Sequence, residues 1–238
     1  MQQIPVEVQA KKQSRKAPTA GSRRANGMLL ALLLGLAMLC SWPAHPEKNP
    51  KAPERTLLVL GDSLSAGFGL AAKEGWVWLL QQRVGARGWR VVNASISGET
   101  SAGGRSRISA ELQRHKPALV IVALGANDGL RGLPVETAQA NLAFILKACK
   151  QASAKVLLVG MEMPPNYGAS YTEAFRNMYR VLAAKQDVPL LPFLLEPIAR
   201  DRAAFQSDNL HPVAAAQPRL LEHVWTMLNS LTAPPPAP

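Results

Sequence analysis

Short apolar runs alternate with longer helical patterns between residues 56 and 231. The runs are Leu57–Leu60, Arg90–Ala94, Ala118–Leu124, Lys155–Gly160 and Val188–Pro192. Two of them, "ALVIVAL" and "VLLVG", are continuously apolar, which is typical of parallel strands that are covered on both faces. Helical periodicity lies near residues 74–87, 102–115, 134–152, 171–186 and 213–231. This alternation predicts an α/β protein, a three-layer α/β/α sandwich around a five-stranded parallel sheet.

Two of the helical patterns carry a clear apolar stripe. The stripe of 134–152 consists of Val135, Ala138, Leu142, Ile145, Leu146 and Cys149. The stripe of 213–231 consists of Val213, Leu220, Leu221, Val224, Trp225, Leu228 and Leu231. Pro134 and Pro212 suit the starts of these helices, where a missing N–H does no harm. Cys149 is therefore expected to be a core residue, with a catalytic cysteine as the weaker alternative.

The two ends of the chain have a different composition from this middle part. Residues 1–44 contain six Lys or Arg and one acid, followed by the uncharged run "MLLALLLGLAMLC" at residues 28–40. A basic region before a short apolar core is typical of a secretory signal. The sequence thus predicts export to the bacterial periplasm, with this segment either removed or retained as a membrane anchor. Residues 45–55 form a Pro-rich linker and residues 232–238 a Pro-rich tail, which leaves a domain at 56–231.

Composition and charge narrow the class of protein. The chain has 238 residues, of which 47% are hydrophobic and 18% charged, as expected of a globular domain. Its net charge is +11, and removal of residues 1–44 leaves 21 basic and 15 acidic residues, a net charge of +6. No dense basic run with interleaved aromatic residues occurs in the domain, so a nucleic-acid partner is not expected. The two cysteines and four histidines have no zinc-site spacing, so we expect no metal.

Polar residues follow four of the predicted strands at their carboxyl ends. Asp62 and Ser63 come after the first strand, and Gly98 follows the second in "NASISGETS". Asn127 lies in "LGANDGL" after the third strand, and "SDNLHP" follows the fifth. The carboxyl ends of parallel strands meet at one edge of the sheet, where such proteins build their sites. These groups are therefore expected to lie together.

A serine hydroxyl is a weak nucleophile and needs a base within hydrogen-bond reach. His211 alone among the four histidines follows the last strand with an acid nearby, Asp208, three residues earlier. Asp208 would hold the imidazole in one tautomer and stabilise the imidazolium that forms when Ser63 loses its proton. The sequence thus predicts a Ser63–His211–Asp208 triad, whose activity should fall when acid protonates His211.

A tetrahedral intermediate also needs hydrogen-bond donors. The candidates are the N–H of Ser63 at a helix start, the N–H of Gly98 and the side-chain amide of Asn127. Each residue also has a structural interpretation: Ser63 and Asp208 as helix or turn caps, Gly98 and Asn127 as turn residues, and His211 as a surface histidine. Those interpretations leave the common position of all five residues at one edge of the sheet unexplained.

Four segments of the chain resemble the conserved blocks of a known family. "GDSLS", "SISGET", "GANDGL" and "DNLHP" are similar, in order and spacing, to the blocks of the SGNH hydrolases, also called GDSL esterases/lipases. "NASISGETS", "LGANDGLRGLP", "MPPNYG" and "HPVAAAQP" are most similar to the bacterial periplasmic acyl-CoA thioesterase I, lysophospholipase and arylesterase group. The resemblance implies a flavodoxin-like fold, no cofactor, and the same triad and oxyanion donors. It further implies that "EMPPNYGASY" borders an acyl-chain channel, with substrate-binding residues Asp62, Leu64, Asn166, Tyr167 and Gly168.

The function predicted on these grounds is hydrolysis of acyl esters, acyl thioesters or lysophospholipids through an acyl-enzyme. The partner would be a small acyl ester or lipid, with transient contact at a membrane surface. Two alternatives stay open: a carbohydrate O-deacetylase on the same fold, and a non-catalytic binding module of flavodoxin type. Neither G-x-G-x-x-G after the first strand nor a Walker-type loop is present, which argues against nucleotide binding.

Overall fold

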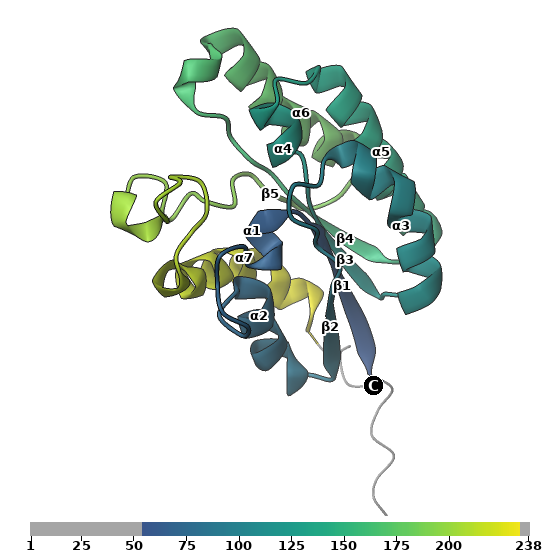
Figure 1. The fold of residues 1–238 in the computed structure, drawn as a ribbon. Helices are drawn as coiled ribbons and strands as arrows, with labels where there is room; N and C mark the ends of the chain where they lie inside the picture. The colour runs from purple at the N-terminus through teal and green to yellow at the C-terminus, as the bar shows by residue number, and fades with distance from the viewer. Residues whose placement is uncertain (1–53, 234–238) are drawn as a thin grey trace, which may run out of the picture. The chain divides into compact units, whose positions relative to one another are not determined.

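Five parallel strands form one sheet in the order β2-β1-β3-β4-β5 (Figure 1). The strands are β1 (Arg55–Gly61), β2 (Trp89–Asn93), β3 (Leu119–Ala123), β4 (Lys155–Val159) and β5 (Leu190–Leu191). The structure is a computed structural model that describes residues 54–233. The predicted signal or anchor at 1–44, residues 45–53 of the linker and residues 234–238 of the tail lie outside the described residues. The α/β class and the five-stranded parallel sheet are confirmed.

Helices cover both faces of the sheet and complete the three layers (Figure 1). The longer helices are α2 (Trp76–Gly85), α3 (Ser101–His115), α5 (Val135–Gln151), α6 (Ala169–Gln186) and α7 (Gln217–Leu231). Helix α5 packs between α3 and α6 on one face, and α2 packs against α7 on the other. Short helices, α1 (Ser63–Ala66) and α4 (Ala126–Leu130), follow β1 and β3 directly. The 3₁₀ turns are η1 (Pro165–Tyr167), η2 (Arg202–Ala204) and η3 (Ala214–Ala216).

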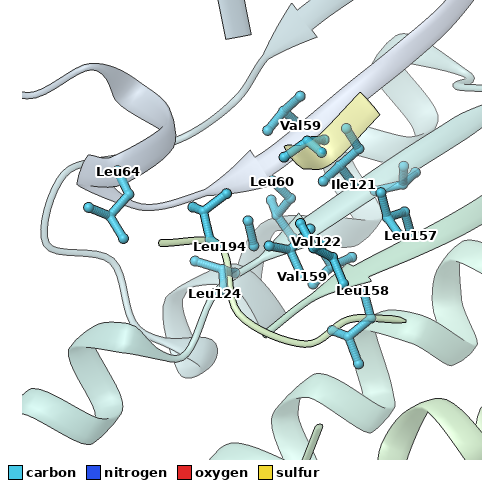
Figure 2. Close-up of a cluster of buried hydrophobic side chains, with 14 of the residues drawn as sticks. Val59, Leu60, Leu64, Ile121, Val122, Leu124, Leu157, Leu158, Val159 and Leu194 are labelled. Carbon is cyan, nitrogen blue, oxygen red and sulfur yellow. The ribbon is translucent and has the colours of Figure 1, made fainter. Parts of the chain in front are cut away.

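The core is built from the apolar strands and the helix stripes that face them. Every residue of β3 is buried, as expected of a central strand covered on both faces. Side chains in register on neighbouring strands lie side by side in this core, among them Leu60, Val122 and Leu158 (Figure 2). Leu64 and Leu194, which lie outside the strands, join the same cluster (Figure 2). Because strands and loops share one packed core, the loops that carry the polar residues are held in place by apolar contacts.

The carboxyl-terminal third of the domain differs from the sequence prediction. The fifth strand is only two residues long, because Pro189 and Pro192 have no N–H to donate to a ladder. The last helix begins at Gln217, so the prediction that Pro212 starts it was wrong. Pro212 instead forms an antiparallel bridge with Phe205, which folds the intervening segment into a loop.

The residues directly outside the predicted range 56–231 also pack against the domain. Arg55 belongs to β1, and its N–H donates to the carbonyl of Gly88 at 2.9 Å. Thr232 is buried, and its carbonyl accepts a 3.1 Å hydrogen bond from the indole Nε1 of Trp89. Within residues 54–233, none of the helices combines the length and the apolar character that a membrane crossing needs.

Candidate active site

Ser63 lies on a tight connection between β1 and the short helix α1. Asp62 caps the helix, because its carboxylate accepts the N–H of Leu64 at 3.0 Å. The capping role considered for Ser63 therefore belongs to its neighbour, and Ser63 is the first helical residue. A side chain at Gly61 would come within 2.8 Å of Ser65, so the turn requires glycine. This geometry places the Ser63 hydroxyl at the carboxyl edge of the sheet.

The loop between Phe205 and Pro212 brings a histidine to this serine. His211 Nε2 lies 2.8 Å from Ser63 Oγ, and His211 Nδ1 lies 2.7 Å from Asp208 Oδ2. The other carboxylate oxygen of Asp208 accepts the N–H groups of Leu210, at 2.9 Å, and of His211, at 3.0 Å. Asp208 thus caps its own turn and holds the imidazole at the same time. The three residues predicted as a triad lie in one continuous hydrogen-bonded chain.

Two carboxyl groups near the serine have shifted pKa values of opposite sign. Hydrogen bonding to His211, and then to two backbone N–H groups, lowers the pKa of Asp208 to about 2. Asp208 is therefore a carboxylate at any pH at which an esterase is active. Its negative charge can stabilise an imidazolium at His211. Burial raises the pKa of Asp62 to about 6, against the lowering effect of its hydrogen bond with Leu64.

An aromatic ring covers the imidazole from the side of the α1 loop. The rings of Phe68 and His211 lie with centroids 4.4 Å apart and planes tilted by 39°. Gln206 joins the two loops: its Nε2 donates to the Phe68 carbonyl at 2.9 Å and its N–H donates to the His211 carbonyl at 2.8 Å. Sequence reasoning missed both residues, since neither lies in a pattern that indicates catalysis.

The proposed oxyanion donors lie on two neighbouring loops. Gly98 has a φ of +80°, in the region that favours glycine, in the turn after β2. Asn127 is in the first turn of α4, and its Nδ2 donates one proton to the Glu99 carbonyl at 3.0 Å. The second proton of that amide is free for a ligand. Both residues line the same cavity as Ser63.

A buried hydrogen-bond network joins these two loops. The Asp128 carboxylate accepts the N–H of Ser101 at 2.7 Å and the hydroxyl of Ser101 at 2.6 Å. Asn141 of α5 donates to the Ser101 hydroxyl oxygen at 3.1 Å. All three side chains are buried. The carboxylate therefore ties α4 to the N-terminus of α3, where a negative charge is favourable. The sequence signal was an acid directly after Asn127, to which we had assigned no role.

A largely apolar cavity of about 480 Å³ opens at the serine. Its apolar lining includes Leu64, Phe68, Leu130, Met161, Met163, Phe193 and Leu195. Of the predicted substrate-binding residues, Leu64 lines this cavity, whereas Asp62 is buried beneath the turn.

The other three predicted substrate-binding residues, Asn166, Tyr167 and Gly168, do not line the cavity. The Tyr167 hydroxyl instead donates to the Leu130 carbonyl at 2.9 Å. The first four residues of the predicted loop, 162–165, border the cavity in their place. A role for Asn166, Tyr167 and Gly168 in substrate binding stays a prediction.

The remaining candidate nucleophile of the described chain is Cys149. Its side chain is buried in the core, and burial raises the pKa of the thiol to about 12. The thiolate that nucleophilic chemistry requires is therefore absent near neutral pH. In the part of the chain that the structure describes, no three His, Cys, Asp or Glu side chains gather as metal ligands would.

Comparison with known proteins gives one consistent result. The model of the GDSL-like Lipase/Acylhydrolase family matches residues 59–217. Esterase TesA of Pseudomonas aeruginosa is 51% identical over 183 residues, 76% of this chain and 91% of the relative. Thioesterase 1/protease 1/lysophospholipase L1 of Escherichia coli is 44% identical over 176 residues, 74% of this chain and 84% of the relative. The crystal structure of TesA superposes with a TM-score of 0.72, at 51% identity, over 74% of this chain and 99% of that one. The chain belongs to the GDSL-like lipase/acylhydrolase family.

Proposed function

We propose that this enzyme hydrolyses acyl esters, acyl thioesters or lysophospholipids through an acyl-enzyme on Ser63. The observation that carries the proposal is the chain of contacts from Ser63 Oγ through His211 to Asp208, at 2.8 and 2.7 Å. This arrangement of hydroxyl, imidazole and carboxylate supports the proposal, because nucleophilic catalysis requires a nucleophile, a base and an orienting group within hydrogen-bond distance.

The proposed reaction has two halves. Ser63 Oγ attacks the acyl carbonyl carbon while His211 Nε2 takes the hydroxyl proton, and the carbonyl oxygen becomes an oxyanion. The N–H groups of Ser63 and Gly98 and the amide of Asn127 would donate to that oxygen. The intermediate then expels the alcohol or thiol, which takes the proton from His211. In the second half, His211 deprotonates a water that attacks the acyl-enzyme, and Ser63 regains its proton as the acid leaves.

The cavity supports an acyl chain as the group bound beside the serine. Leucine, methionine and phenylalanine side chains dominate its walls, and such a surface gains free energy by removing an alkyl chain from water. Esterase, thioesterase and lysophospholipase are also the activities named for the two relatives. An acetylated carbohydrate has little apolar surface to offer this cavity, which disfavours the O-deacetylase alternative. A non-catalytic binding module would not require the hydrogen-bonded chain from Ser63 through His211 to Asp208, which disfavours that alternative.

The test is hydrolysis of p-nitrophenyl acetate, butyrate, octanoate and palmitate, with a lysophospholipid and an acetylated xylan beside them. We expect the octanoate, palmitate and lysophospholipid to exceed the acetyl substrates in kcat/KM. Ser63→Ala should lose activity on all of them. Activity on the acetyl substrates alone would move the assignment to an O-deacetylase, and full activity in Ser63→Ala would refute the nucleophile.

Export of the enzyme and its contact with lipid are part of the same proposal. Export rests on the basic and apolar composition of residues 1–44. Contact with a lipid surface is supported at the cavity rim, where Phe68 is 48% and Leu210 is 42% exposed. Fractionation of cells that express the full chain tests the first point. Co-sedimentation with phospholipid vesicles tests the second, and Phe68→Ser together with Leu210→Ser should weaken it.

A further inference from the structure

A second cavity, of about 670 Å³, lies beside the catalytic one. The two share three lining residues, Glu162, Phe193 and Ala199. Neither Ser63 nor His211 lines the second cavity, so it takes no part in bond cleavage. A substrate arm long enough to fill the catalytic cavity would nevertheless end at this junction.

The order of the strands gives the direction of that arm. The walls of the catalytic cavity come from the loops after all five strands, with Ser63 after β1 and Gly98 after β2, which lies on the side of β1 away from β5. The second cavity adds residues of α6, α7 and the segment after β5. An arm that leaves the reacting carbonyl therefore runs across the sheet edge from β1 to β5. Its far end would meet the second cavity.

The walls of the second cavity are charged rather than apolar. Its three carboxylates each face a basic side chain: Glu162 lies 3.9 Å from Arg176, Glu196 3.5 Å from His223, and Asp201 2.8 Å from Arg219. Arg219 also donates to the Pro197 carbonyl. Two of these three carboxylates are thus paired with a guanidinium, and the third lies beside an imidazole.

Two further guanidinium groups line the same cavity, those of Arg180 and Arg200. Across residues 54–233, neither has an ion pair or a side-chain hydrogen bond, and both are exposed to solvent. A guanidinium presents several N–H donors in a planar fork that matches a carboxylate or a phosphate. Unpaired arginines on a cavity wall therefore favour an anionic ligand.

We propose that Arg180 and Arg200 form an anion-binding subsite for a carboxylate or phosphate carried by the substrate arm that fills the apolar cavity. This inference rests on the proposed function, because it takes the reacting carbonyl to lie at Ser63. The enzyme would then prefer esters whose long arm ends in a negative charge to neutral esters of the same length. The anion could belong to the acyl chain, at its far end, or to the leaving group, as in a phosphoglycerol.

Two matched pairs of substrates distinguish these sources. The first pair is the p-nitrophenyl monoester of a linear dicarboxylic acid and that of the monocarboxylic acid of equal length, in even lengths from six to sixteen carbons. The second pair is 1-acylglycerol 3-phosphate and 1-acylglycerol with the same acyl chains. We expect kcat/KM to favour the anionic member of one pair by about three- to tenfold, as for solvent-exposed charge pairs. The favoured pair identifies the source.

Substitution of the charged residues should change the preference for anionic substrates in a predictable direction. Arg180→Gln together with Arg200→Gln should abolish the preference and leave the neutral substrates unchanged. Glu162→Gln removes a negative charge at the junction and should increase the preference. The matched control is Arg114→Gln, an exposed arginine in the last turn of α3. An equal loss on charged and neutral substrates, or no preference in either pair at any length, would overturn the subsite.

A binding measurement separates this inference from the proposed function. Calorimetric titration with the linear dicarboxylates requires no turnover. Binding that exceeds that of the monocarboxylates, weakens with added salt and is lost in the double arginine variant would support the subsite even if no ester were hydrolysed. Hydrolysis without any of these effects would overturn the subsite and leave the proposed function intact.

Discussion

The buried carboxylate of Asp128 gives the most informative perturbation outside the reacting groups. It accepts two hydrogen bonds from Ser101, at 2.7 and 2.6 Å, and both side chains are buried. Asp128→Ala leaves the N–H and the hydroxyl of Ser101 without that acceptor. It also removes a negative charge from the N-terminus of α3.

The cost follows from these contacts. Each buried polar group left without a partner costs about 1–3 kcal/mol. The charge at the helix N-terminus adds about 0.3–1 kcal/mol. We therefore expect the free energy of unfolding to fall by about 3–5 kcal/mol, which a domain of ordinary stability survives at 25 °C. Because Asn127 precedes Asp128 on α4, a shift of the helix would misplace the proposed oxyanion donor. A misplacement of about 1 Å lowers kcat by as much as about 100-fold.

Urea denaturation and steady-state kinetics on p-nitrophenyl octanoate measure the two effects in one protein. Ser101→Ala keeps the backbone contact but removes two hydrogen bonds of the hydroxyl, the one it donates to Asp128 and the one it accepts from Asn141. It should cost about 2 kcal/mol, at about 1 kcal/mol for each hydrogen bond. Glu136→Ala is the matched control, because Glu136 is an exposed acid in the first turn of α5. It should lose only the small helix-terminal contribution and retain full kcat.

The reasoning is refuted by two results. One is a loss of stability in Asp128→Ala no larger than in Glu136→Ala, which would mean that the buried contacts with Ser101 contribute nothing. The other is a large loss of stability with an unchanged kcat, which would mean that the network does not position α4 for catalysis.

Three further predictions concern the loops around the serine. Asn127→Ala should lower kcat by about 100- to 1000-fold with little change in KM, as loss of one oxyanion donor does; an unchanged kcat would remove Asn127 from the mechanism. Gly125→Ala should unfold at a lower temperature, because φ is +115° there and a Cβ would lie 2.2 Å from the Tyr179 hydroxyl; equal melting temperatures would contradict this. Asp62→Asn keeps an oxygen for the Leu64 N–H. The pKa of Asp62 is raised from 3.8 to about 6, so ionisation of this carboxyl lowers the stability of the folded protein as pH rises through that range. Urea midpoints should therefore show Asp62→Asn gaining stability relative to the native protein between pH 4 and pH 7, by up to about 3 kcal/mol, and no pH-dependent difference would contradict it.

The sheet and its edge were predictable from the sequence because their signals are local. A run such as Leu119–Ala123 is buried on both faces, and five consecutive apolar residues are typical of a central parallel strand. Pro189 and Pro192 shorten β5, because the ladder needs N–H donors that proline lacks. A helix start was expected at Ser63, but the extent of α1 and the existence of α4 were not predicted, because four or five residues are too short to show a helical period.

The candidate site was likewise predictable from the sequence only in part. The contacts of Ser63, His211 and Asp208 could be anticipated, since a strand end and a three-residue spacing place these groups near one another. The packing of the Phe68 ring against His211 could not be anticipated, because it depends on how two loops pack against each other. The loop after β4 was predicted to border the site. The 3₁₀ turn η1 begins at Pro165, the last residue of this loop that lines the cavity.

The most direct measurement of the central claim is the mass of the enzyme after reaction with a p-nitrophenyl alkylphosphonate. Such a reagent transfers its phosphonyl group to an activated serine and releases p-nitrophenolate. We predict one phosphonyl group per chain, mapped by peptide mass spectrometry to Ser63, with loss of esterase activity in proportion to labelling. Ser63→Ala should acquire no label. A label on another residue with equal loss of activity, or full esterase activity in a protein labelled at Ser63, would contradict the account.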